Sequence, residues 1–96
     1  MTFQTAEYFK AIAKERSFTK AAERLHVTQQ TLSAHIAGVE RELGCTLIER
    51  SVPLRLTHQG DTFLAYCERL SAEMRSLRRQ LAGDSAEQTG TLRIGV

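Results

Sequence analysis

The chain has 96 residues, of which 42% are hydrophobic and 25% are charged, with one proline and a formal net charge of +2. This length accommodates one small domain, and the composition excludes collagen-like, low-complexity and wholly disordered structures. No apolar run approaches the roughly 18 to 20 residues of a membrane-spanning helix, and the N-terminal MTFQTAEYFK lacks the pattern of a signal peptide. We therefore expect a cytoplasmic protein with no membrane partner.

The sequence lacks the residue patterns of catalysis and of metal binding. Cys45 and Cys67 have neither CxxC spacing nor a histidine at ligand spacing, so a disulfide framework and a zinc site are not expected. No HExxH, GxSxG, catalytic carboxylate pair or phosphate-binding glycine loop occurs. We therefore expect no enzymatic activity, no metal and no cofactor bound to this chain.

Two helices are predicted before residue 26. Apolar side chains recur on one face of the first: Phe3, Ala6, Phe9, Ile12 and Ala13. Ser17 and Thr19 are two candidate N-caps for the second, shorter helix. Its alanines, Ala21 and Ala22, are small enough to let another helix approach closely.

A third helix is predicted between Thr28, a natural N-cap, and Gly44, which suits the left-handed conformation that commonly ends a helix. Its inward face is a narrow apolar stripe: Leu32, Ile36, Val39 and Leu43. Its outward face is small and polar: Gln29 at the edge, then Gln30, Ser33, Ala34, Ala37 and Arg41. Before this helix, His26 stands where many such turns have glycine, which predicts a turn that needs no left-handed residue.

Two short strands and a long helix follow. Residues 47–50 and 54–56 are predicted as strands, joined by a turn that contains Pro53. Thr57 is expected to cap the helix, whose apolar residues alternate in steps of four and three. This heptad seam predicts pairing with another helix, in a second copy of the chain or, alternatively, with the chain's own first helix. The seam consists of Phe63, Cys67, Leu70, Met74, Leu77 and Leu81.

The composition changes near the end of the chain. Residues 82–90 resemble a linker, and residues 91–96 (TLRIGV) resemble the beginning of a strand. A strand without a partner does not complete a fold. We therefore expect the last residues to begin a further domain of a longer protein.

The second and third helices, with the turn between them, form a helix-turn-helix over residues 18–37. In this motif the first residues of the second helix lie against base edges in the major groove of DNA. Gln29 and Gln30 suit this task because an amide can donate to and accept from adenine at once. Hydroxyls near the helix N-terminus can donate to phosphates: Thr28, Thr31 and Ser33. Residues 26–39 contain no Asp or Glu, whose charge would repel phosphates.

These residues resemble a known family. SFTKAAERLHVTQQTLSAHIAGVERELGCTLIERSVPLRLTHQG is similar to the N-terminal domain of LysR-type transcriptional regulators in its SFTxAAExL helix, its VTQxxLSxxI helix, VERELGCTLIER and RLTxxG. The resemblance implies a mainly α fold: a winged helix-turn-helix over residues 1–58, made of a three-helix core and a two-stranded wing at 47–56. A dimerisation or linker helix follows over 59–82. Residues 83–96 form a hinge and the first strand of an effector-binding domain.

The resemblance also implies partners. The chain would regulate transcription by binding an interrupted palindromic operator in double-stranded DNA, as a homodimer or, in the full-length protein, a tetramer. A small-molecule effector would bind the separate C-terminal domain. Gln29, Gln30 and Ser33 match base-facing positions, and Thr31 and Arg50 match positions near the DNA backbone.

Two departures from the family pattern concern the operator. On the third helix, Gln30 stands where many members have proline or serine, and Ala34 stands where many have arginine. The wing has no arginine at its tip, so that Arg55 is the nearest substitute. We therefore expect affinity to depend more on amide recognition than on charge.

Several alternatives remain at this stage. A helical protein-interaction module on a winged-helix scaffold is the alternative function, with the long helix as its contact surface. The polar residues of the third helix, Arg50 and Arg55 could be ordinary solvated side chains. His35 is equally suited to a structural and to a DNA-facing position, whereas His26 and His58 are interpreted as a turn residue and a helix-end residue.

Overall fold

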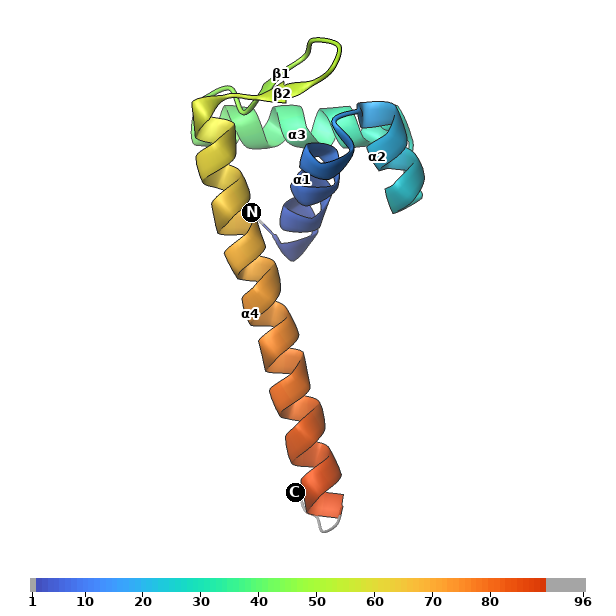
Figure 1. Ribbon diagram of the computed structural model, residues 1–96, viewed down its shortest axis with the longest axis vertical. Helices are drawn as coiled ribbons and strands as arrows, with labels where there is room; N and C mark the ends of the chain where they lie inside the picture. Colours follow the sequence, from blue (N-terminus) through green and yellow to red (C-terminus); the bar gives the residue numbers. More distant parts are fainter. Residues whose placement is uncertain (1, 90–96) are drawn as a thin grey trace.

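The computed structural model describes residues 2–89, with side chains described for residues 2–83. Its elements are α1 (Phe3–Glu15), α2 (Phe18–Leu25), α3 (Gln29–Leu43), β1 (Ile48–Glu49), β2 (Arg55–Leu56) and α4 (His58–Thr89). The first three helices and the hairpin form an N-terminal domain (residues 2–57), from which α4 extends far outward (Figure 1). The predicted winged helix-turn-helix with a long C-terminal helix is confirmed. None of the helices within residues 2–89 is long and apolar enough to cross a membrane.

Side-chain caps begin the helices as the sequence predicts. Ser17, rather than Thr19, caps α2, because its hydroxyl accepts the N–H of Lys20 at 3.2 Å. Thr28 caps α3 by accepting the N–H of Thr31 at 3.0 Å. These hydroxyls satisfy backbone donors that the first turn of a helix leaves without a partner.

The turn of the helix-turn-helix differs from the prediction. His26 has φ 61° and ψ 41°, in the left-handed region. The N–H of His26 bonds to the carbonyl of Glu23 at 3.3 Å, and the N–H of Val27 bonds to that of Ala22 at 3.0 Å. This closure of the last turn of α2 requires a left-handed residue at its C-cap. The prediction that the turn needs none was therefore wrong, and His26 adopts a conformation that costs a non-glycine residue about 1 kcal/mol.

One hydrophobic core joins all parts of the N-terminal domain to the first turns of α4. Phe9 and Ile12 of α1, Leu32 and Ile36 of α3 and Leu47 before β1 are fully buried. The burial of each such side chain contributes about 1.5–3 kcal/mol. The core therefore holds α3 rigidly by Leu32, Ile36 and Val39 and leaves its opposite face exposed. The prediction that Leu43 faces inward was wrong, because this last residue of α3 is 42% exposed.

The wing is short and is attached to α3. Its strands pair antiparallel in the register Ile48 with Leu56 and Glu49 with Arg55. The carboxylate of Glu40 on α3 accepts the N–H of Leu47 at 2.8 Å and that of Ile48 at 3.2 Å. Hydrogen bonds to an ionised acceptor are about twice as strong as neutral ones. Glu40 therefore sets the position of the wing relative to α3.

The heptad seam of α4 divides into two parts. Phe63 packs edge-to-face on Phe9 of α1 with ring centroids 4.8 Å apart, and Cys67 is fully buried. Burial raises the pKa of the Cys67 thiol to about 11. The prediction that Phe63 and Cys67 face a partner chain is therefore corrected, because α1 of the same chain covers them. Leu77 and Leu81, farther along, are 47% and 58% exposed.

The long helix also ends later than predicted. Residues 83–89 were expected in a hinge, but α4 continues through Thr89. Gly83 weakens the helix by about 1 kcal/mol, but the helix continues past it. The strand expected at residues 91–96 lies outside the described residues.

Candidate nucleic-acid interface

The predicted site residues gather on one side of the N-terminal domain. Figure 1 shows the wing lying along α3, while α4 leaves the domain in the opposite direction. The first turn of α3, with its cap, is exposed and polar, and Ser33 lies half-buried one turn farther on. The exposed residues of this turn are Thr28, Gln29, Gln30 and Thr31. This arrangement presents amides and hydroxyls at the positive end of a helix dipole.

Two hydroxyls at this end of α3 are already paired. Thr28 donates its hydroxyl proton to the hydroxyl of Thr31 at 2.8 Å and accepts the Thr31 backbone N–H. The hydroxyl proton of Thr31 is not used in this pair. Thr31 is therefore better placed than Thr28 to donate to an anionic oxygen.

Gln29 is linked to the preceding helix. The Thr19 hydroxyl of α2 donates to its side-chain oxygen Oε1 at 3.1 Å. Both residues are exposed. The link therefore lies at the surface, where it influences which amide atoms of Gln29 face outward.

Arg50 reaches from the end of β1 onto both helices of the motif. Its Nη1 donates to the Ser33 hydroxyl at 3.0 Å, and its guanidinium carbon lies 4.7 Å from the ring centroid of Phe18. Its Nη2 is 3.9 Å from the Glu40 carboxylate. The side chain is nevertheless 43% exposed. Arg50 thus brings a positive charge to the edge of α3 in a defined position.

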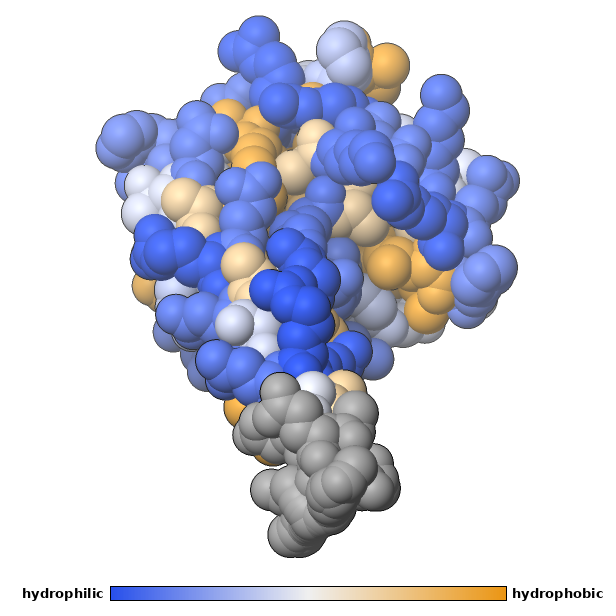
Figure 2. Space-filling view, turned by 60° about the horizontal axis from the view of Figure 1, so that its bottom comes forward, coloured by the Kyte–Doolittle hydropathy of each residue, from blue (hydrophilic) through white to orange (hydrophobic). Residues whose placement is uncertain are grey.

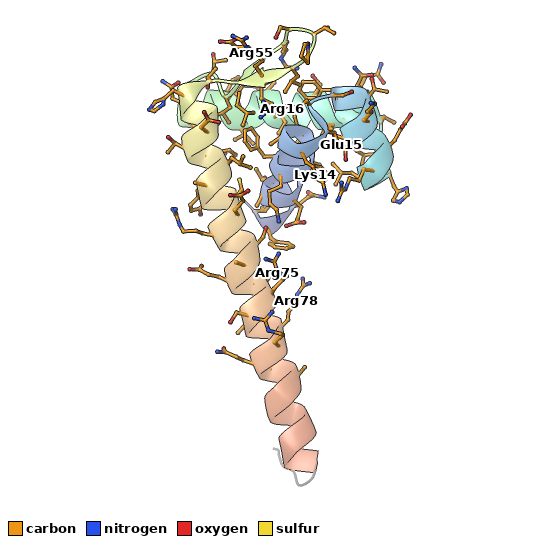
Figure 3. The ribbon with its side chains drawn as sticks, in the orientation of Figure 1. Lys14, Glu15, Arg16, Arg55, Arg75 and Arg78 are labelled. Atoms are coloured by element: carbon orange, nitrogen blue, oxygen red, sulfur yellow. The ribbon has the colours of Figure 1, made fainter. Side chains whose placement is uncertain are left out.

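Arg55 stands apart from this cluster. It lies on β2 with its side chain 70% exposed, and its Nε is 3.7 Å from the carboxylate of Glu49 across the hairpin. Figure 3 shows it on the wing, well away from Arg75 and Arg78 on the outer part of α4. The wing tip itself presents Val52, which is fully exposed and uncharged. Arg55 is therefore a second basic side chain of the wing, exposed and without a described contact to α3.

His35 has a structural position. Its Nε2 lies 2.8 Å from the hydroxyl of Thr5, and its ring packs edge-to-face on Tyr8 at 4.9 Å. Both partners belong to α1. Of the two interpretations left open for His35, the structure supports packing between α1 and α3.

Sequence reasoning missed three residues of this surface: Phe18, Thr19 and Glu40. Thr19 meets a side chain ten positions away, and Glu40 accepts from backbone seven and eight positions away. Separations of this kind have no periodic signature. All three lie in the quoted family-like stretch, and Thr19 was considered only as a helix cap. No group of His, Cys, Asp and Glu suited to a metal ion occurs among the residues whose side chains the structure describes.

Three packed helices, a two-stranded wing and an exposed polar α3 define a winged helix-turn-helix domain. Residues 3–61 match the family described as bacterial regulatory helix-turn-helix protein, lysR family. The chain belongs to this family.

Two relatives illustrate the similarity in sequence. The HTH-type transcriptional regulator BenM of Acinetobacter baylyi is 39% identical over 99 residues, which cover 99% of this chain and 31% of BenM. A probable RuBisCO transcriptional regulator of Thalassiosira pseudonana is 41% identical over 95 residues, which cover 98% of this chain and 31% of that protein. The chain therefore spans slightly less than a third of the length of these relatives.

Solved structures show the same fold. The BenM DBD in complex with benA site 1 DNA matches 85% of this chain and 96% of that chain with a TM-score of 0.82 and 36% identity. The CbnR DBD in its DNA complex matches 86% of this chain and 98% of that chain with a TM-score of 0.76 and 36% identity.

Proposed function

We propose that this chain is the operator-reading domain of a LysR-type transcriptional regulator, which binds double-stranded DNA with α3 in the major groove. One observation carries the proposal: the first turns of α3 are exposed, polar and free of Asp and Glu, with Arg50 at their edge. Gln29, Gln30 and Ser33 would face bases, and Thr28, Thr31, Arg50 and Arg55 would face the DNA backbone. The similarity to two domains solved with DNA supports this orientation.

The proposal includes a homodimer on an interrupted palindrome. Leu77 and Leu81 expose apolar surface on an outer part of α4 that α1 does not cover. Together with the half-buried Leu70 and Met74, they would pair with the same helix of a second copy. A dimer of this kind places two α3 helices on two half-sites.

Other parts of the proposal concern the whole protein. A small-molecule effector would bind a separate domain, and the full-length protein would act as a dimer or tetramer. We expect no catalytic step and no cofactor on this chain. Regulation would take place in the cytoplasm, where bacterial DNA lies.

The alternative, a protein-interaction module, requires a large apolar contact surface. Figure 2 views the molecule obliquely from the outer end of α4 and shows hydrophilic residues over most of this face, with hydrophobic residues in separate patches. The exposed face of α3 is also polar. These features favour DNA over a protein as the partner of α3.

Selection of binding sites from random duplex DNA near physiological salt tests the proposal. We expect an interrupted palindrome, and we expect Gln29→Ala to relax one base position at a cost of about 1–3 kcal/mol. Gln80→Ala, the same change at an exposed position far along α4, is the matched control. If no sequence is enriched even at low salt, the proposal fails and the interaction module takes its place.

A further inference from the structure

Three side chains of α3 would face bases: Gln29, Gln30 and Ser33. Two of them, Gln29 and Ser33, each accept a hydrogen bond from a residue outside α3. Thr19 on α2 donates to the side-chain oxygen of Gln29, and Arg50 after β1 donates to the hydroxyl of Ser33. Each donor thus pairs with an acceptor atom of its neighbour. Both hydrogen bonds therefore restrict how these side chains of α3 can face DNA.

The amide of Gln29 is oriented by its neighbour. Bidentate recognition of adenine requires the amide nitrogen to donate to N7 while the amide oxygen accepts from the N6 amino group. Both atoms must then face the base edge together. In the structure Oε1 is turned toward the Thr19 hydroxyl at 3.1 Å. An amide turned in this way would bring its nitrogen, which only donates, toward DNA.

Ser33 also accepts a hydrogen bond from its neighbour. A guanidinium has five donors and no acceptor, so Arg50 occupies an acceptor position of the serine hydroxyl. The guanidinium cannot turn away freely, because the ring of Phe18 and the carboxylate of Glu40 also contact it. The hydroxyl proton of Ser33 therefore points elsewhere. The serine oxygen keeps a second lone pair, so Ser33 presents both a donor and an acceptor.

We propose that Thr19 is a positioning residue that turns the amide nitrogen of Gln29, a donor, toward DNA. The base opposite Gln29 then carries an acceptor in the major groove, foremost guanine with N7 and O6, and also thymine with O4. Adenine offers an acceptor beside a donor, and cytosine offers a donor, so both are disfavoured there. This inference rests on the proposed function and replaces the expectation that Gln29 reads adenine through both amide atoms.

The test uses the 96-residue chain and the operator recovered by selection. Gln29→Ala first identifies the base pair that depends on Gln29. Dissociation constants are then measured by fluorescence anisotropy for duplexes with each of the four base pairs at that position. We expect the wild type to prefer guanine or thymine over adenine by about fivefold or more, the range of one directed hydrogen bond.

Thr19→Val removes the hydroxyl at nearly constant volume and frees the Gln29 amide to rotate. We expect the preference over adenine to fall to about one or to reverse. Thr19→Ser keeps the hydroxyl and should keep the wild-type preference, so it is the matched control. A general loss of folding or affinity would lower binding to all four duplexes alike and would leave their ratios unchanged.

Three outcomes overturn the inference while the proposed function stands: wild-type preference for adenine at the Gln29 position, unchanged preference in Thr19→Val, or no base position that depends on Gln29. Failure of the wild type to select any duplex sequence is a different result. It overturns the proposed function as well, so the two failures can be told apart.

Discussion

The hydroxyl of Ser71, which is 1% exposed on α4, donates a 2.6 Å hydrogen bond to the carboxylate of Glu7 on α1. The ammonium group of Lys10 lies 3.4 Å from the same carboxylate oxygen. This link lies just beyond the point where Phe63 and Cys67 enter the core. It therefore contributes to the direction in which α4 leaves the N-terminal domain, and with it to the spacing of two α3 helices in a dimer.

Glu7 makes this link sensitive to pH. Partial burial raises the pKa of its carboxyl, but the Ser71 hydrogen bond and the cations of Lys10 and Arg75 outweigh this effect, and the net pKa is lowered from its ordinary 4.5. A group with a lowered folded-state pKa stabilises the fold fully above its unfolded value, and that stability is lost as the pH falls through the folded value.

We therefore expect Glu7→Gln to destabilise the chain by about 1 kcal/mol at about pH 7, a discounted value because the side chain is 40% exposed. The difference in the free energy of unfolding between the variant and the wild type should disappear as the pH is lowered below 4.5. Urea unfolding followed by circular dichroism at several pH values measures this. Glu73→Gln, an exposed position on α4, is the control for the lost charge. A difference that persists at acid pH would contradict the electrostatic origin.

The helices and their caps could be predicted because they depend on local sequence. Thr28 and Gly44 bound α3 as expected, since a hydroxyl before a helix and a glycine after it act within one turn. His26 could not be predicted in the same way. Its left-handed conformation follows from how α2 must end for α3 to pack on it, which no single residue reveals.

The exposed polar side chains of α3 could be predicted from the sequence, but their hydrogen bonds to other elements could not. The polar face of α3 follows from its helical period, because the opposite stripe is apolar. The links from Thr19 to Gln29 and from Arg50 to Ser33 join separate elements and exist only once the fold is formed. A heptad pattern is the same whether the helix packs on α1 or on another chain. It could therefore not show that Phe63 and Cys67 are core residues of this chain.

Gly60 should tolerate no side chain. A Cβ atom there would overlap the carbonyl oxygen of Leu47 and would lie 3.2 Å from the Cβ of Leu56. Because the first obstacle is backbone, Gly60→Ala must displace the start of α4 or the wing, at a cost of roughly 2–4 kcal/mol in urea unfolding. Gly38→Ala is the contrasting control in α3. Its new Cβ would have Arg41 Nη2 as its nearest neighbour at 3.7 Å, and we expect a gain of about 0.5–1 kcal/mol. Equal stability of both variants would contradict the close approach at Gly60.

The outer part of α4 should hold the dimer together. Leu77→Asp with Leu81→Asp leaves the single-chain core untouched, because both leucines are largely exposed. We expect monomers in sedimentation and the loss of cooperative half-site binding, since two desolvated carboxylates oppose helix pairing. Ala65→Asp with Ala72→Asp places the same charges on exposed alanines of the other side of α4 and should leave the dimer intact. Unchanged sedimentation of the leucine variant would show that the outer part of α4 does not form the dimer interface.

Arg50 should have two separable effects on DNA binding. As a cation at the edge of α3 it should contact a phosphate, so Arg50→Ala should weaken binding to every duplex and reduce the salt slope by about one unit. As the donor to Ser33 it should also sharpen discrimination at the base opposite that residue.

Arg50→Lys separates the two effects. Lysine keeps the charge, and with it the salt slope, but it has neither the planar fork nor the stacking surface that now spans Ser33 and Phe18. We therefore expect Arg50→Lys to lose discrimination at the Ser33 base while its salt dependence stays close to that of the wild type. Arg55→Ala, on the exposed strand β2, should do the opposite and lower the salt slope without changing base preference. If lysine restored both affinity and discrimination, Arg50 would act through its charge alone, and the contact with Ser33 would have no part in reading DNA.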